Sequence, residues 1–179
     1  NLSALLDNLL SWALLNRGMI PYHPEVLSPA SEATLNFEIH ENAARAKDIR
    51  LENHIPEHLR VSADRNALQT ILRNLIGNAV KFTPPGGSVT VGGGEKDGQV
   101  VISVSDTGAG ISAEKMDQLF SLEKRSEHGT AGEKGAGLGL VLCRELAELN
   151  KGSLRIFSAE GTGARFEISL PGEGGMNQD

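Results

Sequence analysis

The chain has 179 residues, of which 39% are hydrophobic but only 4% aromatic, so aliphatic side chains must fill a single core. The formal net charge of -6 and the scattered Lys and Arg residues argue against a surface for nucleic acid or an anionic membrane. The single cysteine, Cys143, excludes an internal disulfide framework, and neither a signal peptide nor an apolar run of about 18 residues is present. We therefore expect a cytoplasmic chain without direct membrane contact, from a protein that is either free or anchored through another segment.

Residues 1–17 have the spacing of one amphipathic helix that ends at Gly18. Its apolar positions recur three and four residues apart, at Leu2, Leu5, Leu6, Leu9 and Ala13. The pattern starts without a capping residue, which indicates a truncated helix or a preceding segment outside the sequence. Three prolines in residues 18–29 then predict an extended stretch. We assign residues 18–26 to a linker, residues 27–171 to the main domain and residues 172–179 to a disordered tail.

The main domain is predicted to combine several strands with three longer helices, which is typical of a two-layer α+β fold. The helix over 31–47 has apolar residues at Ala33, Leu35, Ile39, Ala43 and Ala46. The strongest helix covers 64–82, because Asp64 can cap its first turn and the sequence TPPGG follows it. In chain order, the other expected elements are strands over 49–53 and 59–63, a hairpin of strands over 88–93 and 99–105, a short helix over 113–119, a helix over 140–150, and strands over 153–159 and 164–170.

Three polar residues share one face of the predicted helix over 64–82. Asn74, Asn78 and Lys81 lie at i, i+4 and i+7, roughly 100° around the helix from its apolar stripe. An amide oxygen is a suitable ligand for Mg²⁺, and a lysine can reach phosphate. By themselves, these residues are more typical of a solvated helix face.

A second group of residues follows the predicted strand VVISVS. Asp106 stands at the end of this strand, and Gly108 and Gly110 come directly after it. The carboxylate can accept a hydrogen bond from an exocyclic amine such as that of adenine, and the glycines let the backbone turn beneath a flat ring. On its own, this sequence is also compatible with an ordinary turn.

Residues 132–140 (GEKGAGLGL) form a glycine-rich loop that leads into a predicted helix. Backbone N–H groups followed by a helix N-terminus are suited to binding phosphate. The loop is neither a dinucleotide fingerprint, because no strand leads into it, nor a Walker loop, because no GK[ST] follows. A flexible linker is the alternative.

Taken together, these motifs occur in an order typical of one family. NLIGNAVKFT, DTGAGI, LFSLEK and GEKGAGLGL resemble its asparagine box, first glycine box, phenylalanine box and second glycine box, and GTGARFEI follows them. The chain thus resembles, over about residues 27–171, the catalytic and ATP-binding domain of histidine kinases, within the gyrase/histidine-kinase ATPase superfamily (the Bergerat fold). The resemblance implies a mixed, mostly antiparallel sheet of about five strands covered on one face by three helices.

The resemblance also implies the cofactors ATP and Mg²⁺ and a role for individual residues. Asn78 would hold Mg²⁺, Lys81 would contact phosphate, and Asn74 would stand where gyrase-type ATPases have a water-activating glutamate. Because an amide cannot take up a proton, Asn74 favours transfer of the γ-phosphoryl group to a protein over hydrolysis.

At the base end, Asp106 would bind the adenine amine, Gly108 and Gly110 would shape the ring site, and Thr162 would act through a water. The remaining nucleotide-binding residues implied by the family are Gly135, Gly137, Leu138 and Gly139, with Lys124 and Lys134 in an ATP lid over 120–134. Arg125 is an alternative source of lid charge. The phenylalanine box departs from the family pattern, because Leu122 stands where a second aromatic residue is expected.

The histidine that would accept the phosphoryl group is not evident in the sequence. The helix over 1–17 resembles the end of the second helix of a dimerisation and phosphoacceptor domain. None of the five histidines has the His-Glu context of an acceptor. We interpret His40 as a surface helix residue, and His54 and His58 as residues that flank an exposed turn. His23 is interpreted as a linker residue and His128 as a lid residue. We therefore expect ATP binding without autophosphorylation of the isolated chain.

The leading hypothesis is the catalytic domain of a two-component sensor histidine kinase. Its partners would be the dimerisation and phosphoacceptor helical domain and, downstream, a response regulator receiver domain, with no nucleic acid. Two alternatives remain: a serine kinase of the anti-sigma type on the same fold, and a nucleotide-binding regulatory module without catalysis.

Overall fold

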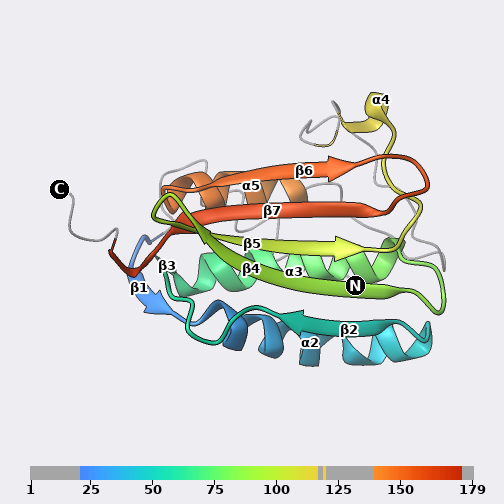
Figure 1. The fold of residues 1–179 in the computed structure, drawn as a ribbon, viewed down its shortest axis with the longest axis horizontal. Helices are drawn as coiled ribbons and strands as arrows, with labels where there is room; N and C mark the ends of the chain where they lie inside the picture. The colour runs from blue at the N-terminus through green and yellow to red at the C-terminus, as the bar shows by residue number, and fades with distance from the viewer. Residues whose placement is uncertain (1–20, 117–118, 120–138, 175–179) are drawn as a thin grey trace.

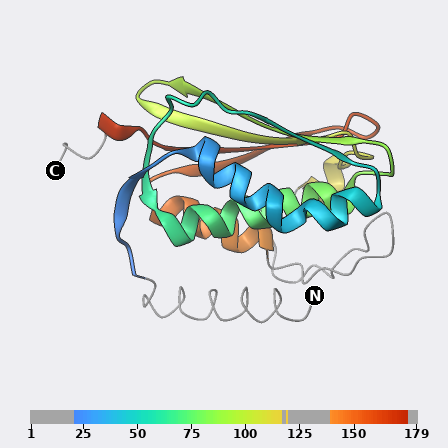
Figure 2. The same ribbon diagram turned by 90° about the horizontal axis from the view of Figure 1, so that it is seen from below.

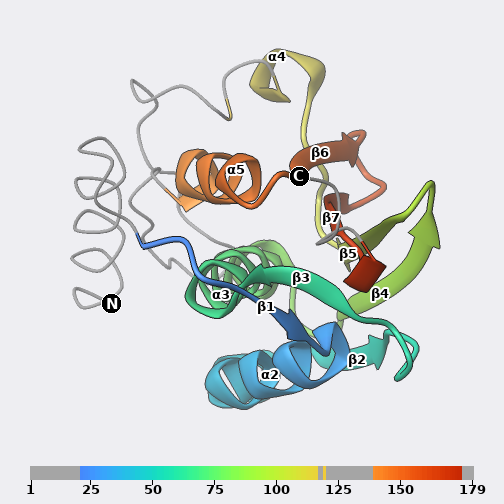
Figure 3. The ribbon, with the colours of Figure 1, turned by 90° about the vertical axis from the view of Figure 1, so that its left-hand side faces the viewer.

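The computed structural model describes residues 21–116, 119 and 139–174. A five-stranded sheet forms one layer, and helices α2, α3 and α5 form the other (Figure 1). The end-on view shows these three helices on the same face of the curved sheet (Figure 3). The elements are β1 (Pro24–Leu27), α2 (Pro29–Ala46), β2 (Arg50–His54), β3 (Val61–Asp64), α3 (Arg65–Phe82), β4 (Ser88–Lys96), β5 (Gln99–Asp106), α4 (Ala113–Met116), α5 (Gly139–Leu149), β6 (Ser153–Ser158) and β7 (Ala164–Pro171).

The large sheet has the strand order β2-β4-β5-β7-β6. Strand β2 runs parallel to β4, and every other neighbouring pair is antiparallel. The mixed, mostly antiparallel sheet of five strands under three helices is therefore confirmed. Among the described residues, no helix is long and apolar enough to cross a membrane.

A second, two-stranded sheet was not predicted. Strand β1 pairs antiparallel with β3, with Pro24 opposite Asp64 and Leu27 opposite Val61. Residues 24–26, which we assigned to a linker, therefore form part of a paired strand. The extended conformation that the prolines predict is the one this pairing uses.

Helix α3 forms as its sequence predicts. The Asp64 side chain accepts a hydrogen bond from the Ala67 N–H at 3.0 Å, and Thr83 ends the helix by donating its N–H to the Ala79 carbonyl. Its apolar face is completely buried, at Leu68, Ile71, Leu72, Leu75 and Ile76. This face packs on the sheet, so the opposite edge of the same helix remains available for polar residues.

Helix α2 presents a different face to the domain from the one its apolar residues predict. Leu35 and Ile39 are 46% and 62% exposed, whereas the polar residues Glu32 and Asn36 are buried. The helix also begins at Pro29, two residues earlier than predicted, because Ser28 caps it. Of the apolar positions noted over 31–47, Ala33 is therefore buried, whereas Leu35 and Ile39 lie outside the buried face.

Helices α2 and α3 run side by side in the same direction (Figure 2). Glu32 pairs with Arg65, the ring of His40 hydrogen-bonds to the carbonyl of Arg73, and Lys47 donates to the carbonyl of Val80. The two partners are 33 residues apart in each of these contacts. A single register therefore relates the two helices along their whole length.

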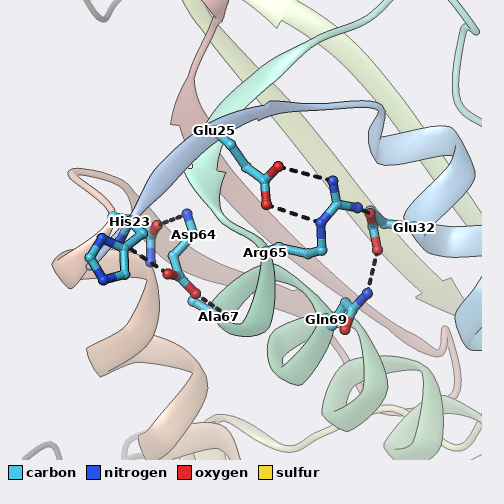
Figure 4. A network of polar contacts seen from close by, with 8 residues as sticks. His23, Glu25, Glu32, Asp64, Arg65, Ala67 and Gln69 are labelled. Atoms are coloured by element: carbon cyan, nitrogen blue, oxygen red, sulfur yellow. Dashed lines mark hydrogen bonds and ion pairs between the residues drawn. The ribbon is translucent and has the colours of Figure 1, made fainter. Parts of the chain in front are cut away.

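The N-terminal end of this helix pair is tied to strand β1 (Figure 4). The guanidinium of Arg65 lies between the carboxylates of Glu25 and Glu32, and Gln69 donates to the second oxygen of Glu32 at 2.9 Å. Next to it, the carboxylate of Asp64 accepts the backbone N–H of His23 at 3.1 Å. Strand β1 is thereby fixed to the first turn of α3.

Candidate functional site

The predicted asparagine pair lies on a half-buried edge of α3, and Asn74 lies next to the start of α5. Asn74 donates a hydrogen bond from Nδ2 to the carbonyl of Thr70 at 2.8 Å. Its Oδ1 lies against Gly139, the first residue of α5, where an added Cβ would come within 2.7 Å of it. The structure therefore brings the last glycine of the second glycine box next to the first asparagine.

Asn78 and Lys81 are half-buried one and two turns further along α3. Among the described residues, the side chain of Asn78 makes no hydrogen bond or ion pair. The Nζ of Lys81 lies 4.7 Å from the ring centroid of Phe82, at the end of the helix. The three side chains thus follow one line along the helix, as their spacing predicts.

Asp106 ends β5 and is half-buried. Its Oδ1 accepts hydrogen bonds from the backbone N–H of Gly108 at 2.8 Å and of Ala164 at 3.3 Å. Burial raises the pKa of the carboxyl above its usual value, and these two hydrogen bonds partly oppose the shift. Among the described residues, no group donates a hydrogen bond to Oδ2 of Asp106.

Two glycines of the first glycine box allow very close backbone contacts. A Cβ on Gly108 would lie 2.7 Å from the carbonyl oxygen of Phe82, the last residue of α3. A Cβ on Gly110, which has a φ of 75°, would lie 1.9 Å from the carbonyl oxygen of Ala159. Larger residues at either position would separate this loop from α3 or from the β6–β7 turn.

The β6–β7 turn contributes a residue that the sequence analysis missed. Gly163 has a φ of 77°, and a Cβ there would lie 2.0 Å from the carbonyl oxygen of Asp106. Thr162, by contrast, is exposed and donates its hydroxyl to the carbonyl of Ala159 at 2.9 Å. The GTG sequence was the available signal, but its second glycine rather than its threonine touches Asp106.

Ser158 is a further residue that the sequence did not reveal. Its Oγ accepts the N–H of Ile111 at 2.9 Å and donates to the carbonyl of Gly163 at 2.7 Å. Residue Gly161 also donates its N–H to the carbonyl of Ala109 at 2.7 Å. The DTGAG loop and the β6–β7 turn are therefore joined into one backbone framework around Asp106.

Several predicted site residues lie outside the described part of the chain. These are the second-glycine-box residues Gly135, Gly137 and Leu138, the lid residues Lys124, Arg125 and Lys134, and His128. Of that glycine box, Gly139 is described and lies at Asn74. Within the described residues, no group of three or more His, Cys, Asp or Glu side chains forms a metal site.

One histidine has surroundings that differ from our prediction. His40 is half-buried, not a free surface residue, and its Nε2 lies 3.1 Å from the carbonyl oxygen of Arg73 on α3. Burial is the main cause that lowers its pKa. His54 and His58 are exposed, as predicted, and His23 is also exposed.

Comparison with known proteins gives a consistent result. Residues 63–174 match the family described as histidine kinase-, DNA gyrase B- and HSP90-like ATPase. A sensor-like histidine kinase of Rhizobium meliloti (strain 1021) is 38% identical over 156 residues, which cover 86% of this chain and 29% of that protein. The histidine protein kinase DivJ of Caulobacter vibrioides is 43% identical over 116 residues, which cover 65% of this chain and 19% of DivJ.

The similarity extends to solved structures. Full-length ShkA in complex with AMPPNP has a TM-score of 0.80 and 28% identity, with 96% of this chain and 36% of ShkA covered. This chain spans less than a third of the length of the two curated relatives. The chain therefore belongs to the histidine kinase-, DNA gyrase B- and HSP90-like ATPase family, and its fold is that of histidine-kinase catalytic domains.

Proposed function

We propose that this chain binds Mg-ATP and is the catalytic domain of a two-component sensor histidine kinase. It would transfer the γ-phosphoryl group of ATP to a histidine on a dimerisation and phosphoacceptor domain. The observation that carries the proposal is the setting of Asp106: two backbone N–H groups hold one carboxylate oxygen, and no group among the described residues donates to the other. The AMPPNP complex of the relative ShkA agrees with a nucleotide site on this fold.

At the base end, Oδ2 of Asp106 would accept the exocyclic amine of adenine. Gly108, Gly110 and Gly163 support this role, because their missing side chains allow the surrounding backbone to close around the carboxylate. Thr162 would contribute through a water, because its hydroxyl oxygen can still accept a hydrogen bond while it donates to the carbonyl of Ala159. Base recognition would depend mainly on Asp106 and the glycines.

At the phosphate end, the donor set of α3 fits a magnesium ion that is also bound by phosphate oxygens. Asn78 would be its protein ligand, since Mg²⁺ prefers oxygen and usually takes few protein ligands when phosphates are present. When bound, Mg²⁺ would neutralise charge on the transferring phosphoryl group. Lys81 would contact phosphate, and Lys124, Lys134, Gly135, Gly137, Leu138 and Gly139 would complete the phosphate side.

Asn74 supports phosphotransfer rather than hydrolysis as the reaction. Its Nδ2 donates to Thr70, and an amide oxygen cannot act as a general base toward water at neutral pH. A bound ATP would therefore keep its γ-phosphoryl group until a protein nucleophile arrives. The acceptor histidine would come from the helical domain, and a response regulator receiver domain would receive the group next, both in the cytoplasm.

Nucleotide titration of the purified chain tests the binding step. We expect Mg-dependent binding of AMPPNP that Asp106→Ala and Asn78→Ala each weaken at least tenfold, the loss of one good polar contact. Phosphotransfer from ATP to a supplied phosphoacceptor domain tests the reaction, and the product should be acid-labile phosphohistidine. An acid-stable phosphoserine, or equal binding by all three proteins, would contradict the proposal.

A further inference from the structure

The face of α3 next to the asparagine pair is held by a side chain from α2. His40 contacts α3 at two residues: Nε2 hydrogen-bonds to the carbonyl oxygen of Arg73 at 3.1 Å, and the ring lies on Gly77. Residues 73 and 77 immediately precede Asn74 and Asn78. One imidazole therefore fixes the helix turn from which both asparagines project.

The hydrogen bond determines which form of the imidazole is present. A carbonyl oxygen can only accept, so the Nε2 of His40 carries the proton and donates it to Arg73. In a regular helix, the same carbonyl already accepts the N–H of residue 77. His40 thus adds a second hydrogen bond to a carbonyl that is paired within the helix, and its loss would not leave that oxygen without a partner.

Gly77 provides the space for the ring. A Cβ at this position would lie 3.0 Å from Cε1 of His40 and 3.5 Å from Nε2. Any side chain at residue 77 would therefore crowd the imidazole ring. Glycine is unfavourable in a helix interior, which makes its presence between Asn74 and Asn78 unexpected on helix propensity alone. The contact with His40 accounts for it.

Two other α2 residues keep His40 in register. Glu32 pairs with Arg65 at the start of α3, and Lys47 donates to the carbonyls of Val80 at 2.8 Å and of Lys81 at 3.0 Å at the helix end. Because α2 is held at both ends of α3, the imidazole between them cannot slide along the helix.

We propose that His40 is a positioning residue for the asparagine pair, and that it sets the magnesium-dependent part of nucleotide affinity without touching the nucleotide. The inference rests on the proposed function, because it requires Asn78 to bind Mg²⁺ beside the phosphates. Base recognition at Asp106 lies outside the helix turn that His40 contacts, so it should be unaffected.

The test separates these two parts of the affinity. AMPPNP binding is measured by calorimetry with saturating Mg²⁺ and again with EDTA, and the ratio of the two dissociation constants gives the magnesium-dependent gain. His40→Leu should reduce this gain about fivefold, the size of one neutral hydrogen bond, and leave the affinity in EDTA unchanged. His40→Gln, whose amide nitrogen can replace Nε2 as donor, should restore the gain.

Two controls exclude a general loss of structure. Ile39→Ala changes the neighbouring residue of α2, whose side chain is 62% exposed, and should retain the wild-type gain. Gly77→Ala should reduce the gain in the wild-type background but should cause no further reduction when added to His40→Ala, which removes the ring that the new Cβ would meet.

An unchanged gain in His40→Leu, or a His40→Gln variant that behaves like His40→Leu, would overturn the inference while leaving the proposed function intact. A wild-type chain that binds no AMPPNP would overturn the proposed function and this inference together. Equal losses with Mg²⁺ and with EDTA would show that His40 is only a structural residue.

Discussion

Gly163 lies directly against the backbone of Asp106, so closely that a Cβ would come within 2.0 Å of the aspartate carbonyl oxygen. The contact joins the β6–β7 turn to the end of β5. It places the Ala164 N–H, which follows Gly163, within hydrogen-bond distance of the Asp106 carboxylate. The geometry of the base site thus depends on a residue 57 positions later in the chain.

Replacement of Gly163 should therefore impair nucleotide binding. Gly163→Ala introduces both a strained φ near 77° and a collision with backbone, so we expect a loss of stability above about 2 kcal/mol and at least tenfold weaker AMPPNP binding. Gly161→Ala is the matched control, since its φ is 79° but its Cβ would meet no atom within 4 Å. It should cost about 1 kcal/mol and leave affinity unchanged. Equal effects of the two variants would contradict this prediction.

Asp106→Asn should separate stability from binding. Burial raises the pKa of Asp106, so the folded domain disfavours the charged carboxylate, and the amide variant should be at least as stable in urea as the wild type. Its affinity for AMPPNP should nevertheless fall at least tenfold. The NH₂ group of the amide would take the place of Oδ2, and it donates hydrogen bonds instead of accepting one from the adenine amine. A variant that loses stability and keeps affinity would show that Asp106 is structural.

The same shift predicts how binding depends on pH. Between the usual pKa of 3.8 and the raised folded value, the native state holds more protons than the unfolded state, so this group's contribution to stability decreases as pH rises through that interval. Affinity for the adenine amine has the opposite trend, because it needs the ionised carboxylate. AMPPNP titrations from pH 7.5 downward should show affinity falling as pH approaches the raised pKa, with no such fall in Asp106→Asn.

His40 should make the domain less stable in mild acid. Burial lowers its pKa, and the positive charge of Arg73 acts in the same direction, so below the model-peptide value of 6.5 the unfolded chain takes up a proton that the folded chain resists. The free energy of unfolding should therefore decrease as pH falls from 6.5 to the folded pKa, and this part of the decrease should vanish in His40→Gln. Urea titrations at closely spaced pH values, with both proteins, measure the difference.

The two carboxylates that flank Arg65 should differ in importance. Glu32 is 2% exposed and Glu25 is about half exposed, although both pair with the same guanidinium. Loss of the buried carboxylate removes the partner of Gln69 and one of the two partners of Arg65, so Glu32→Leu should cost about 2 kcal/mol, whereas Glu25→Leu should cost less than about 1 kcal/mol. Chemical denaturation of the two variants tests this, and similar values for both would show that burial does not decide the strength of the pair.

Cys143 should be inert in the native state. Its side chain is fully buried with Sγ 3.8 Å from the carbonyl oxygen of Ile71, and burial strongly raises the pKa of the thiol. Alkylation by iodoacetamide at pH 8 should therefore proceed only through unfolding, at a rate that increases with urea. Rapid labelling of the folded protein would contradict the buried position.

The elements that local sequence determines were predicted well. Helix α3 was correct at both ends, because the cap at Asp64 and the stop after Phe82 are local signals. The hairpin of β4 and β5 was also correct in outline, although each strand extends beyond its predicted end. Asn74 and Asn78 could be placed on one face because helix geometry alone fixes their relation.

The features that the sequence did not reveal depend on partners distant in the chain. The face of α2 that contacts α3 includes Glu32, His40 and Lys47, whose polar side chains look like surface residues until α3 supplies their acceptors and donors. The role of Gly163 likewise could not be predicted, because it depends on the contact with the backbone of Asp106, which is distant in the sequence. Hydrophobic periodicity carries no information about either kind of contact.

Three polar contacts that lie along the length of α2 and α3 share one separation of 33 residues. A shift of α2 by one helical turn would break the contacts of Glu32, His40 and Lys47 together, because all of them share one register. Insertions into the connection between the helices can be tolerated only where the added residues loop out. Amide hydrogens along the two helices should accordingly exchange with solvent in a single cooperative opening.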